Sequence, residues 1–166
     1  MSLKHKLPIP KRSAKDIYEI TPAFLREQGI KLLLMDLDNT LSPYIVDEAT
    51  EELKQWIETL KAGGIEPFIF SNNKGDRPML FAEQLQLEYV KLAKKPRQGM
   101  LHTVLADKGY TPAETAIIGD QIYTDTLGAN GAGVQSILVK AIDNHNFWLK
   151  ARHVLEKPFI YAARKR

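Results

Sequence analysis

The stretch LLLMDLDNT, residues 32–40, decides which kind of fold this chain adopts. Its first four residues are all apolar, which predicts a strand covered on both faces, as in a parallel sheet. Asp36 and Asp38 end that strand and, being two residues apart, point to the same side. Two carboxylates that close repel each other unless a cation or a proton lies between them. A strand end followed by a turn at Asn39 explains the same residues, because Asp and Asn favour such turns.

Strands alternate with helices along the rest of the chain. Short apolar runs predict strands, and apolar residues spaced by three and four predict helices. The expected strands are residues 32–35, 67–70, 88–92, 115–118 and 134–139, and the expected helices contain residues 53–60, 80–85, 101–105 and 123 onward. This alternation predicts a three-layer α/β fold with a doubly wound parallel sheet. In such sheets ligands bind beyond the carboxyl ends of the strands.

Length and composition indicate one soluble globular domain. The chain has 166 residues, of which 44% are hydrophobic and 26% are charged, the proportions of an ordinary globular protein. It contains no cysteine, which excludes disulfides and thiolate metal sites. The apolar runs are too short to cross a bilayer, and the amino-terminal residues do not form the apolar core of a signal peptide. We therefore expect a cytoplasmic protein.

Positive charge collects at the two ends of the chain. The first twelve residues hold five Lys, Arg or His residues and no acid, and the chain ends in Ala-Arg-Lys-Arg. We expect a basic amino-terminal arm, residues 1–29, and an aromatic and basic tail, residues 146–166. These ends either remain solvated or contact an anionic lipid surface, which would make the protein peripheral at a membrane. We expect no nucleic acid partner.

Polar side chains follow four of the five predicted strands. Ser71 follows the second strand, Lys94 and Lys95 precede the helix at residue 101, and Asp120 ends the strand at 115–118, with Asp125 beyond it. Several carboxylates on one sheet edge suit Mg²⁺, which prefers oxygen ligands. A lysine and a hydroxyl are the donors that a phosphoryl group needs, and a carboxylate can attack phosphorus. Asp125 in the first turn of a helix is also explained by the helix dipole alone.

These residues resemble a known family when they are taken together. The order Asp-x-Asp-x-Thr at 36–40, Ser71, Lys95-Pro96 and Gly-Asp-x4-Asp at 119–125 resembles the four motifs of the haloacid dehalogenase (HAD) superfamily. The motifs are weak singly and specific in combination, and they extend over most of the chain. The sequences Ser-Asn-Asn and Lys-Lys-Pro make the chain similar to the YqeG-like branch of subfamily IIIA, which is related to phosphatidylglycerophosphate phosphatases.

The resemblance implies a role for each residue in an Mg²⁺-dependent phosphatase. Asp36 would be the nucleophile and a metal ligand, and it would form an aspartyl-phosphate. Asp38 would act as general acid and then as base, with its backbone carbonyl on the metal. The remaining expected site residues are Asp120 as a metal ligand, Ser71, Asn72 and Lys95 as phosphate-binding groups, and Thr40 and Asp125 as supporting groups.

The resemblance also bears on the substrate, a phosphomonoester. Residues 41–47 and 71–95 leave no room for an inserted cap domain, so we expect a capless enzyme that takes a bulky anionic substrate. YqeG-like relatives imply phosphatidylglycerophosphate, which would bring a lipid head group to the site. The alternatives are a phosphatase of small soluble metabolites or nucleotides, a phospho-receiver module, and a HAD scaffold without catalysis. The second strand ends in Ser71 rather than an acid, which fits a receiver poorly.

Overall fold

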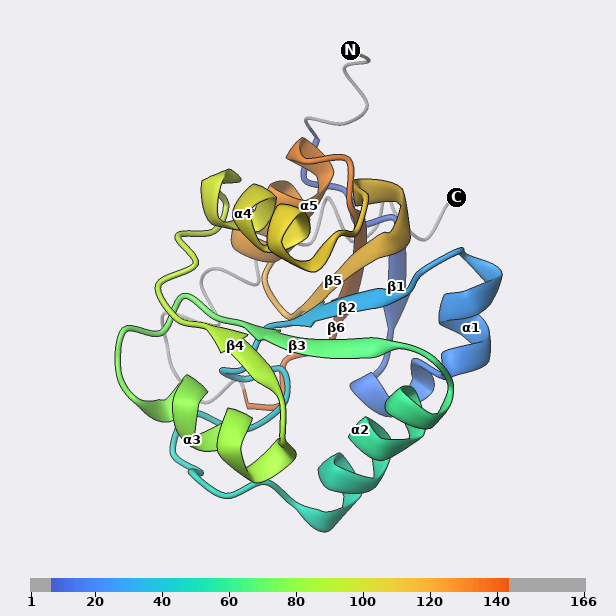
Figure 1. Cartoon of the computed structure of the whole chain (residues 1–166). Coiled ribbons are helices and arrows are strands. Elements are labelled where there is room, and N and C mark those ends of the chain that lie inside the picture. Colours follow the sequence, from blue (N-terminus) through green and yellow to red (C-terminus); the bar gives the residue numbers. More distant parts are fainter. Residues whose placement is uncertain (1–6, 144–166) are drawn as a thin grey trace.

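A single parallel sheet forms the centre of the molecule (Figure 1). The computed structural model of the protein describes residues 7–143. The strands lie in the order β1-β6-β5-β2-β3-β4. They are β1 (Arg12–Ala14), β2 (Leu32–Met35), β3 (Glu66–Phe70), β4 (Glu88–Val90), β5 (Thr115–Gly119) and β6 (Gln135–Val139). The expected α/β fold with a doubly wound parallel sheet is confirmed.

β2 lies in the interior of the sheet, between β5 and β3, and all four of its residues are buried. Leu33 and Met35 pack into one hydrophobic core, and Leu32 and Leu34 pack into a second core on the opposite face. The uninterrupted apolar run therefore reflects burial on both faces, since successive side chains of a strand point to opposite sides.

Helices cover both faces of the sheet, as Figure 1 shows. The helices α1 (Pro22–Glu27), α2 (Glu51–Ala62) and α3 (Arg77–Leu85) pack into the first core. On the other face lie α4 (Gly99–Lys108) and α5 (Leu127–Gly131). Three short helical turns, η2 (Ile17–Glu19), η3 (Pro112–Glu114) and η4 (Ile122–Thr126), complete the elements. The helix expected from residue 123 begins as the π-helical turn η4 and continues as α5.

The amino-terminal region differs from the expected basic arm. β1 pairs in parallel with β6, so residues 12–14 form one edge of the sheet. Ile17, Ile20 and Leu25, which follow β1, are buried in the first core. Residues 12–27 therefore belong to the folded domain. The expected tail at 146–166 lies outside the described residues.

Asp76 does not cap α3 as its position suggests. It precedes the helix but makes no capping hydrogen bond through its side chain, and Lys91 pairs with it at 3.3 Å instead. The short turn η3 is capped as the sequence Thr-Pro-Ala-Glu at 111–114 predicts, because the Glu114 carboxylate accepts hydrogen bonds from the backbone N–H and the hydroxyl of Thr111.

The loops at the carboxyl edge of the sheet are short. Residues 36–50 join β2 to α2 through turns, and residues 71–76 join β3 directly to α3. Within residues 7–143 neither position holds an inserted cap, in agreement with the expectation from the sequence. None of the described helices is long and apolar enough to cross a membrane.

Candidate active site

The loops after β2, β3, β4 and β5 meet around one pocket at the carboxyl edge of the sheet. The pocket has a volume of about 210 Å³. It is lined by Asp36, Asp38, Tyr44, Ser71, Asn72, Asn73, Lys95, Gln121 and Thr124. Residues from four separate segments of the chain therefore face one small space. A larger groove of about 550 Å³ lies near the amino ends of β3 and β4, away from these residues.

A buried lysine lies at the base of this pocket. The Lys95 ammonium donates hydrogen bonds to Asp36 Oδ1 at 2.6 Å and to Asp125 Oδ1 at 2.7 Å, and all three side chains are buried. Burial alone would lower the pKa of Lys95, but Asp125 and Asp36 raise that pKa well above its ordinary value. The lysine therefore stays charged, and it compensates two acids that burial would otherwise make costly.

The Lys95 backbone is held as firmly as its side chain. Its N–H donates to Asn72 Oδ1 at 2.7 Å, and Asn72 Nδ2 donates to the Lys95 carbonyl at 3.0 Å. This reciprocal pair joins the loop after β3 to the loop after β4. Asn72 thus positions the lysine through its backbone, a role that the sequence alone does not distinguish from phosphate binding.

Asp125 packs directly against the end of β5. A Cβ atom at Gly119 would collide with the Asp125 carboxylate, so glycine is required for this close approach. Asp125 Oδ2 also accepts a hydrogen bond from the Gln121 N–H at 3.2 Å. Both Asp125 oxygens are therefore engaged by protein donors, which favours a supporting role for this acid.

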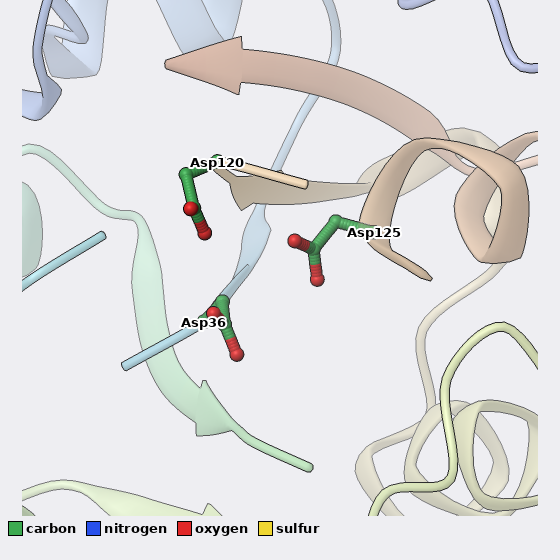
Figure 2. A group of neighbouring side chains, drawn as sticks. All are labelled: Asp36, Asp120 and Asp125. Carbon is green, nitrogen blue, oxygen red and sulfur yellow. The ribbon is translucent and has the colours of Figure 1, made fainter. Parts of the chain in front are cut away.

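Three carboxylates converge on one volume, as Figure 2 shows. One oxygen from each of Asp36, Asp120 and Asp125 lies within 4.8 Å of the other two. Thr40 fixes Asp120, because its hydroxyl donates to Asp120 Oδ1 and accepts from the Asp120 N–H, each at 3.1 Å. A buried set of carboxylate oxygens fits Mg²⁺. Lys95 and Gln121 together occupy both carboxylate oxygens of Asp125, whereas Lys95 binds only Oδ1 of Asp36. Asp36 and Asp120 are therefore the better candidates for metal ligands.

Asp38 also lines the pocket but is held by a different cation. Asn73 Nδ2 donates to Asp38 Oδ2 at 2.8 Å, and the Arg77 guanidinium forms an ion pair with Asp38 Oδ1. The Asp38 side chain is not part of the three-carboxylate cluster. The expected contact of its backbone carbonyl with a metal stays a prediction.

Arg77 was not among the residues expected from the sequence. It is the first residue of α3, where the helix dipole disfavours a cation, and that unusual position is the one signal that could have identified it. Besides Asp38, its guanidinium donates to the carbonyls of Pro43 and Val46, both at 2.6 Å, and lies 5.0 Å from the centre of the Phe81 ring. Arg77 therefore ties Asp38 to residues 43–46, further along the same loop.

The remaining expected residue lies in the pocket as well. Ser71 is buried at the end of β3, and its hydroxyl oxygen accepts a hydrogen bond from the Asn73 N–H at 3.1 Å. This contact leaves the Ser71 hydroxyl proton available for another acceptor, such as a phosphate oxygen.

The chain is similar to known hydrolases and phosphatases over most of its length. Residues 92–150 match a family model described as HAD-hydrolase-like. The chain is 32% identical to a "Probable phosphatase YqeG" of Bacillus subtilis, over 97% of this chain and 94% of that protein. It is 26% identical to the chloroplastic/mitochondrial phosphatidylglycerophosphate phosphatase 1 of Arabidopsis thaliana, over 92% of this chain and 43% of that longer protein.

A solved structure supports the fold. The cobalt-bound deoxy-D-mannose-octulosonate 8-phosphate phosphatase of Haemophilus influenzae superposes with a TM-score of 0.55, covering 78% of this chain and 89% of that one. Its sequence identity to this chain is 16%, so the likeness concerns the fold.

Arg77→Met should destabilise the protein strongly. The change leaves the Asp38 carboxylate without its cation in a largely buried position, and loss of one partner of such a pair costs about 3 kcal/mol. Arg77→Lys keeps the charge but not the planar set of donors, so we expect an intermediate loss. Chemical denaturation measures the free energies of unfolding. The control is Lys91→Met, which removes the exposed ion pair with Asp76 and should cost less than about 1 kcal/mol. Equal losses in Arg77→Met and the control would contradict this account.

Asp36→Asn should stabilise the metal-free protein in a pH-dependent way. Burial, opposed by Lys95, raises the pKa of Asp36 to about 7. Between about pH 4 and pH 7 the folded state thus holds a proton that the unfolded state has lost, so its free energy of unfolding falls as pH rises through this window. Asparagine does not ionise, so this contribution to the pH dependence of the free energy of unfolding is absent in the variant. The Tm difference between variant and wild type should therefore grow from about pH 5 to about pH 8.

The control for this measurement is Asp107→Asn, at an exposed position of α4. Its Tm difference from wild type should stay nearly constant over the same range. If the Asp36→Asn difference were also constant, the assigned cost of ionising Asp36 would be wrong.

Proposed function

Because this chain is a phosphohydrolase of the YqeG-like branch of the HAD superfamily, we propose that it hydrolyses a phosphomonoester with Mg²⁺ through an aspartyl-phosphate. The observation that carries this proposal is the buried Lys95 ammonium between Asp36 and Asp125. It provides a fixed positive charge beside a carboxylate at the base of a pocket of phosphate size. A phosphate dianion needs such a charge, since otherwise one anion would have to attack another.

In this proposal the residues around the pocket bind and orient the phosphate group. Lys95 and the Ser71 hydroxyl donate hydrogen bonds to its oxygens, and Asn72 holds Lys95 in place. Asp36 and Asp120 would hold Mg²⁺, with Asp125 and Thr40 supporting Lys95 and Asp120 respectively. When bound, Mg²⁺ offsets the negative charge of the phosphate and of its surrounding carboxylates.

Chemistry then proceeds in two displacements. An Asp36 oxygen attacks phosphorus, the bond from phosphorus to the ester oxygen breaks, and Asp38 gives the departing oxygen a proton. In the second step Asp38 takes a proton from water, the water oxygen bonds to phosphorus, and the bond to Asp36 breaks. Inorganic phosphate and the unmodified enzyme result.

Hydrogen bonds to both oxygens position Asp38 for these two steps. Asn73 donates to Oδ2, and Arg77 donates to Oδ1. A carboxyl group can accept these bonds whether or not it carries a proton, so the same position serves the acid of the first step and the base of the second.

The physiological substrate we propose is a lipid phosphate such as phosphatidylglycerophosphate. The Arabidopsis relative carries that activity in its name, and the described chain has no cap to enclose a small ester. The pocket of about 210 Å³ is smaller than the pockets that enclose a drug-sized ligand, so the acyl chains of a lipid substrate would lie outside it. Small soluble phosphate esters and nucleotides are the alternative, and a comparative phosphatase screen separates the two. The cytoplasmic location stays a prediction.

Asp36→Asn should abolish turnover, because an amide cannot attack phosphorus. We expect a loss of roughly a thousandfold or more in kcat for a soluble aryl phosphate. Asp107→Asn, which changes an exposed acid, should retain wild-type turnover. Activity of Asp36→Asn within tenfold of wild type would refute the role of nucleophile, and absence of turnover in the wild type would favour a receiver module or an inactive scaffold.

Asp38→Asn should slow the second step and allow the phosphoenzyme to accumulate. Intact-mass measurement after brief exposure to substrate would then detect a phosphate adduct that the wild type does not build up. A normal steady-state rate for this variant would show that Asp38 is neither the acid nor the base.

Removal of divalent cations should stop turnover without unfolding the protein. The two cores consist of apolar side chains, while the candidate ligands lie at the edge of the sheet. Mg²⁺ should raise the Tm of the wild type, since a ligand that binds the folded state stabilises it. In Asp120→Asn that Tm increase should be much reduced. Full turnover in excess chelator would contradict the metal requirement.

A further inference from the structure

The loop after β2 carries a rigid turn at residues 43–46 beside the pocket. The Val46 N–H donates to the Pro43 carbonyl at 3.2 Å, which closes the turn. Arg77 donates to the Pro43 carbonyl and to the Val46 carbonyl, each at 2.6 Å. The Ser42 hydroxyl also donates to the Val46 carbonyl, at 3.2 Å. The conformation of the turn is thus set by its own backbone and by two side chains. Tyr44, at its tip, lines the pocket.

Ile45, next to Tyr44 at the tip, is 90% exposed. Two further aliphatic side chains are exposed on neighbouring loops, Leu92 after β4 at 47% and Ile142 after β6 at 51%. Both loops are tied to the site, because the Leu92 N–H donates to the Asn73 carbonyl at 3.1 Å and the Ile142 N–H donates to the Asn39 carbonyl at 3.0 Å. We call Ile45, Leu92 and Ile142 the apolar rim.

Exposure of the apolar rim is unfavourable in water, and hydrogen bonds hold the backbone of each of the three loops. Each loop follows the carboxyl end of a strand, so the three side chains lie on the edge of the sheet that holds the pocket. Exposed apolar side chains on the edge that holds a functional site are candidates for a contact surface. The rim is spread over three loops rather than joined into one groove, which suits a broad, deformable apolar phase better than a shaped protein partner.

Basic residues lie between the members of the rim. Lys94 and Lys140 are exposed on the loops after β4 and β6, Lys74 is exposed on the loop after β3, and among the described residues these three lysines form no ion pair. Two exposed acids at this edge are already paired, Asp47 with Arg77 and Asp76 with Lys91. Within residues 7–143, the exposed acids of this edge without an ion pair are Glu48 and Glu52, so the three lysines leave an excess of positive charge beside the rim, which favours an anionic surface.

We propose that the apolar rim and its lysines dock this protein on an anionic lipid bilayer, with the catalytic pocket facing the lipid head groups. Side chains of this kind enter the boundary between head groups and acyl chains, while lysines remain with the anionic head groups. The inference rests on the proposed function, because docking brings a lipid-borne phosphate to Asp36. It assigns membrane contact to loops of the folded domain rather than to the basic ends of the chain.

Co-sedimentation of the full chain with vesicles tests this docking. Wild type should bind vesicles that contain an anionic phospholipid, should bind purely zwitterionic vesicles weakly, and should lose binding at high salt. The double variant Ile45→Ser/Leu92→Ser should bind anionic vesicles at least about tenfold more weakly, since apolar side-chain burial drives insertion. Leu7→Ser is the matched control. Leu7 is 46% exposed, but its carbonyl accepts a hydrogen bond from Asn130, which places it at the opposite edge of the sheet.

The soluble activity separates failure of docking from failure of the proposed function. The double variant should keep wild-type turnover of a soluble aryl phosphate, whereas Asp36→Asn should lose turnover and still bind vesicles. Turnover retained by Asp36→Asn would refute the proposed chemistry and leave the docking result unaffected.

Four outcomes would overturn the docking proposal. The first is wild type that ignores anionic vesicles at low salt, and the second is undiminished binding by the double variant. The third is parallel loss of vesicle binding and soluble turnover in the double variant, which would mean that the rim acts on the pocket itself. The fourth is self-association of wild type that the double variant abolishes, which would identify a second copy of the chain as the partner.

Discussion

The ion pairs of the buried Lys95 ammonium with Asp36 and Asp125 constrain most of the site. Three charges buried this close together are tolerated because each carboxylate has the lysine within hydrogen-bond distance. That arrangement requires the loop before α4 to be locked by Asn72, and it requires a residue without a side chain at Gly119. One electrostatic requirement thus accounts for features in three separate loops.

A second cation organises the outer half of the site. Arg77 neutralises Asp38 and holds the turn at residues 43–46, so the position of an acid and the shape of the pocket opening depend on one side chain. In a chain with a cap, an inserted domain could hold these loops. Here polar bonds between neighbouring loops do so, including those of Asn39, whose side-chain amide exchanges two hydrogen bonds with the backbone of Asp143. In the absence of a cap, the polar residues of the site itself therefore hold its loops in place.

Stability and function are in opposition at this edge of the sheet. Burial raises the pKa of Asp36 to about 7 even though Lys95 opposes this shift, so the lysine offsets only part of the cost of burying the carboxylate that is needed for attack. The exposed apolar rim is a second local cost. Both are offset by the two apolar cores on either side of β2, and a protein keeps such costs where a ligand or a surface relieves them.

The sequence by itself determined the class of fold and the chemistry of the edge. The apolar run at 32–35, the helical spacing that begins at Leu53, and the polar residues after four of the strands are local patterns that burial imposes directly. β1 was not predicted from the sequence, because an edge strand of three residues that are not buried has no apolar pattern. Arg77 and the supporting position of Asp125 were decided only by the tertiary structure. Arg77 acts on Asp38, 39 residues away, and Asp125 acts on Lys95, 30 residues away, while also packing against Gly119. Only folding brings these side chains together, so no local sequence pattern indicates their contacts.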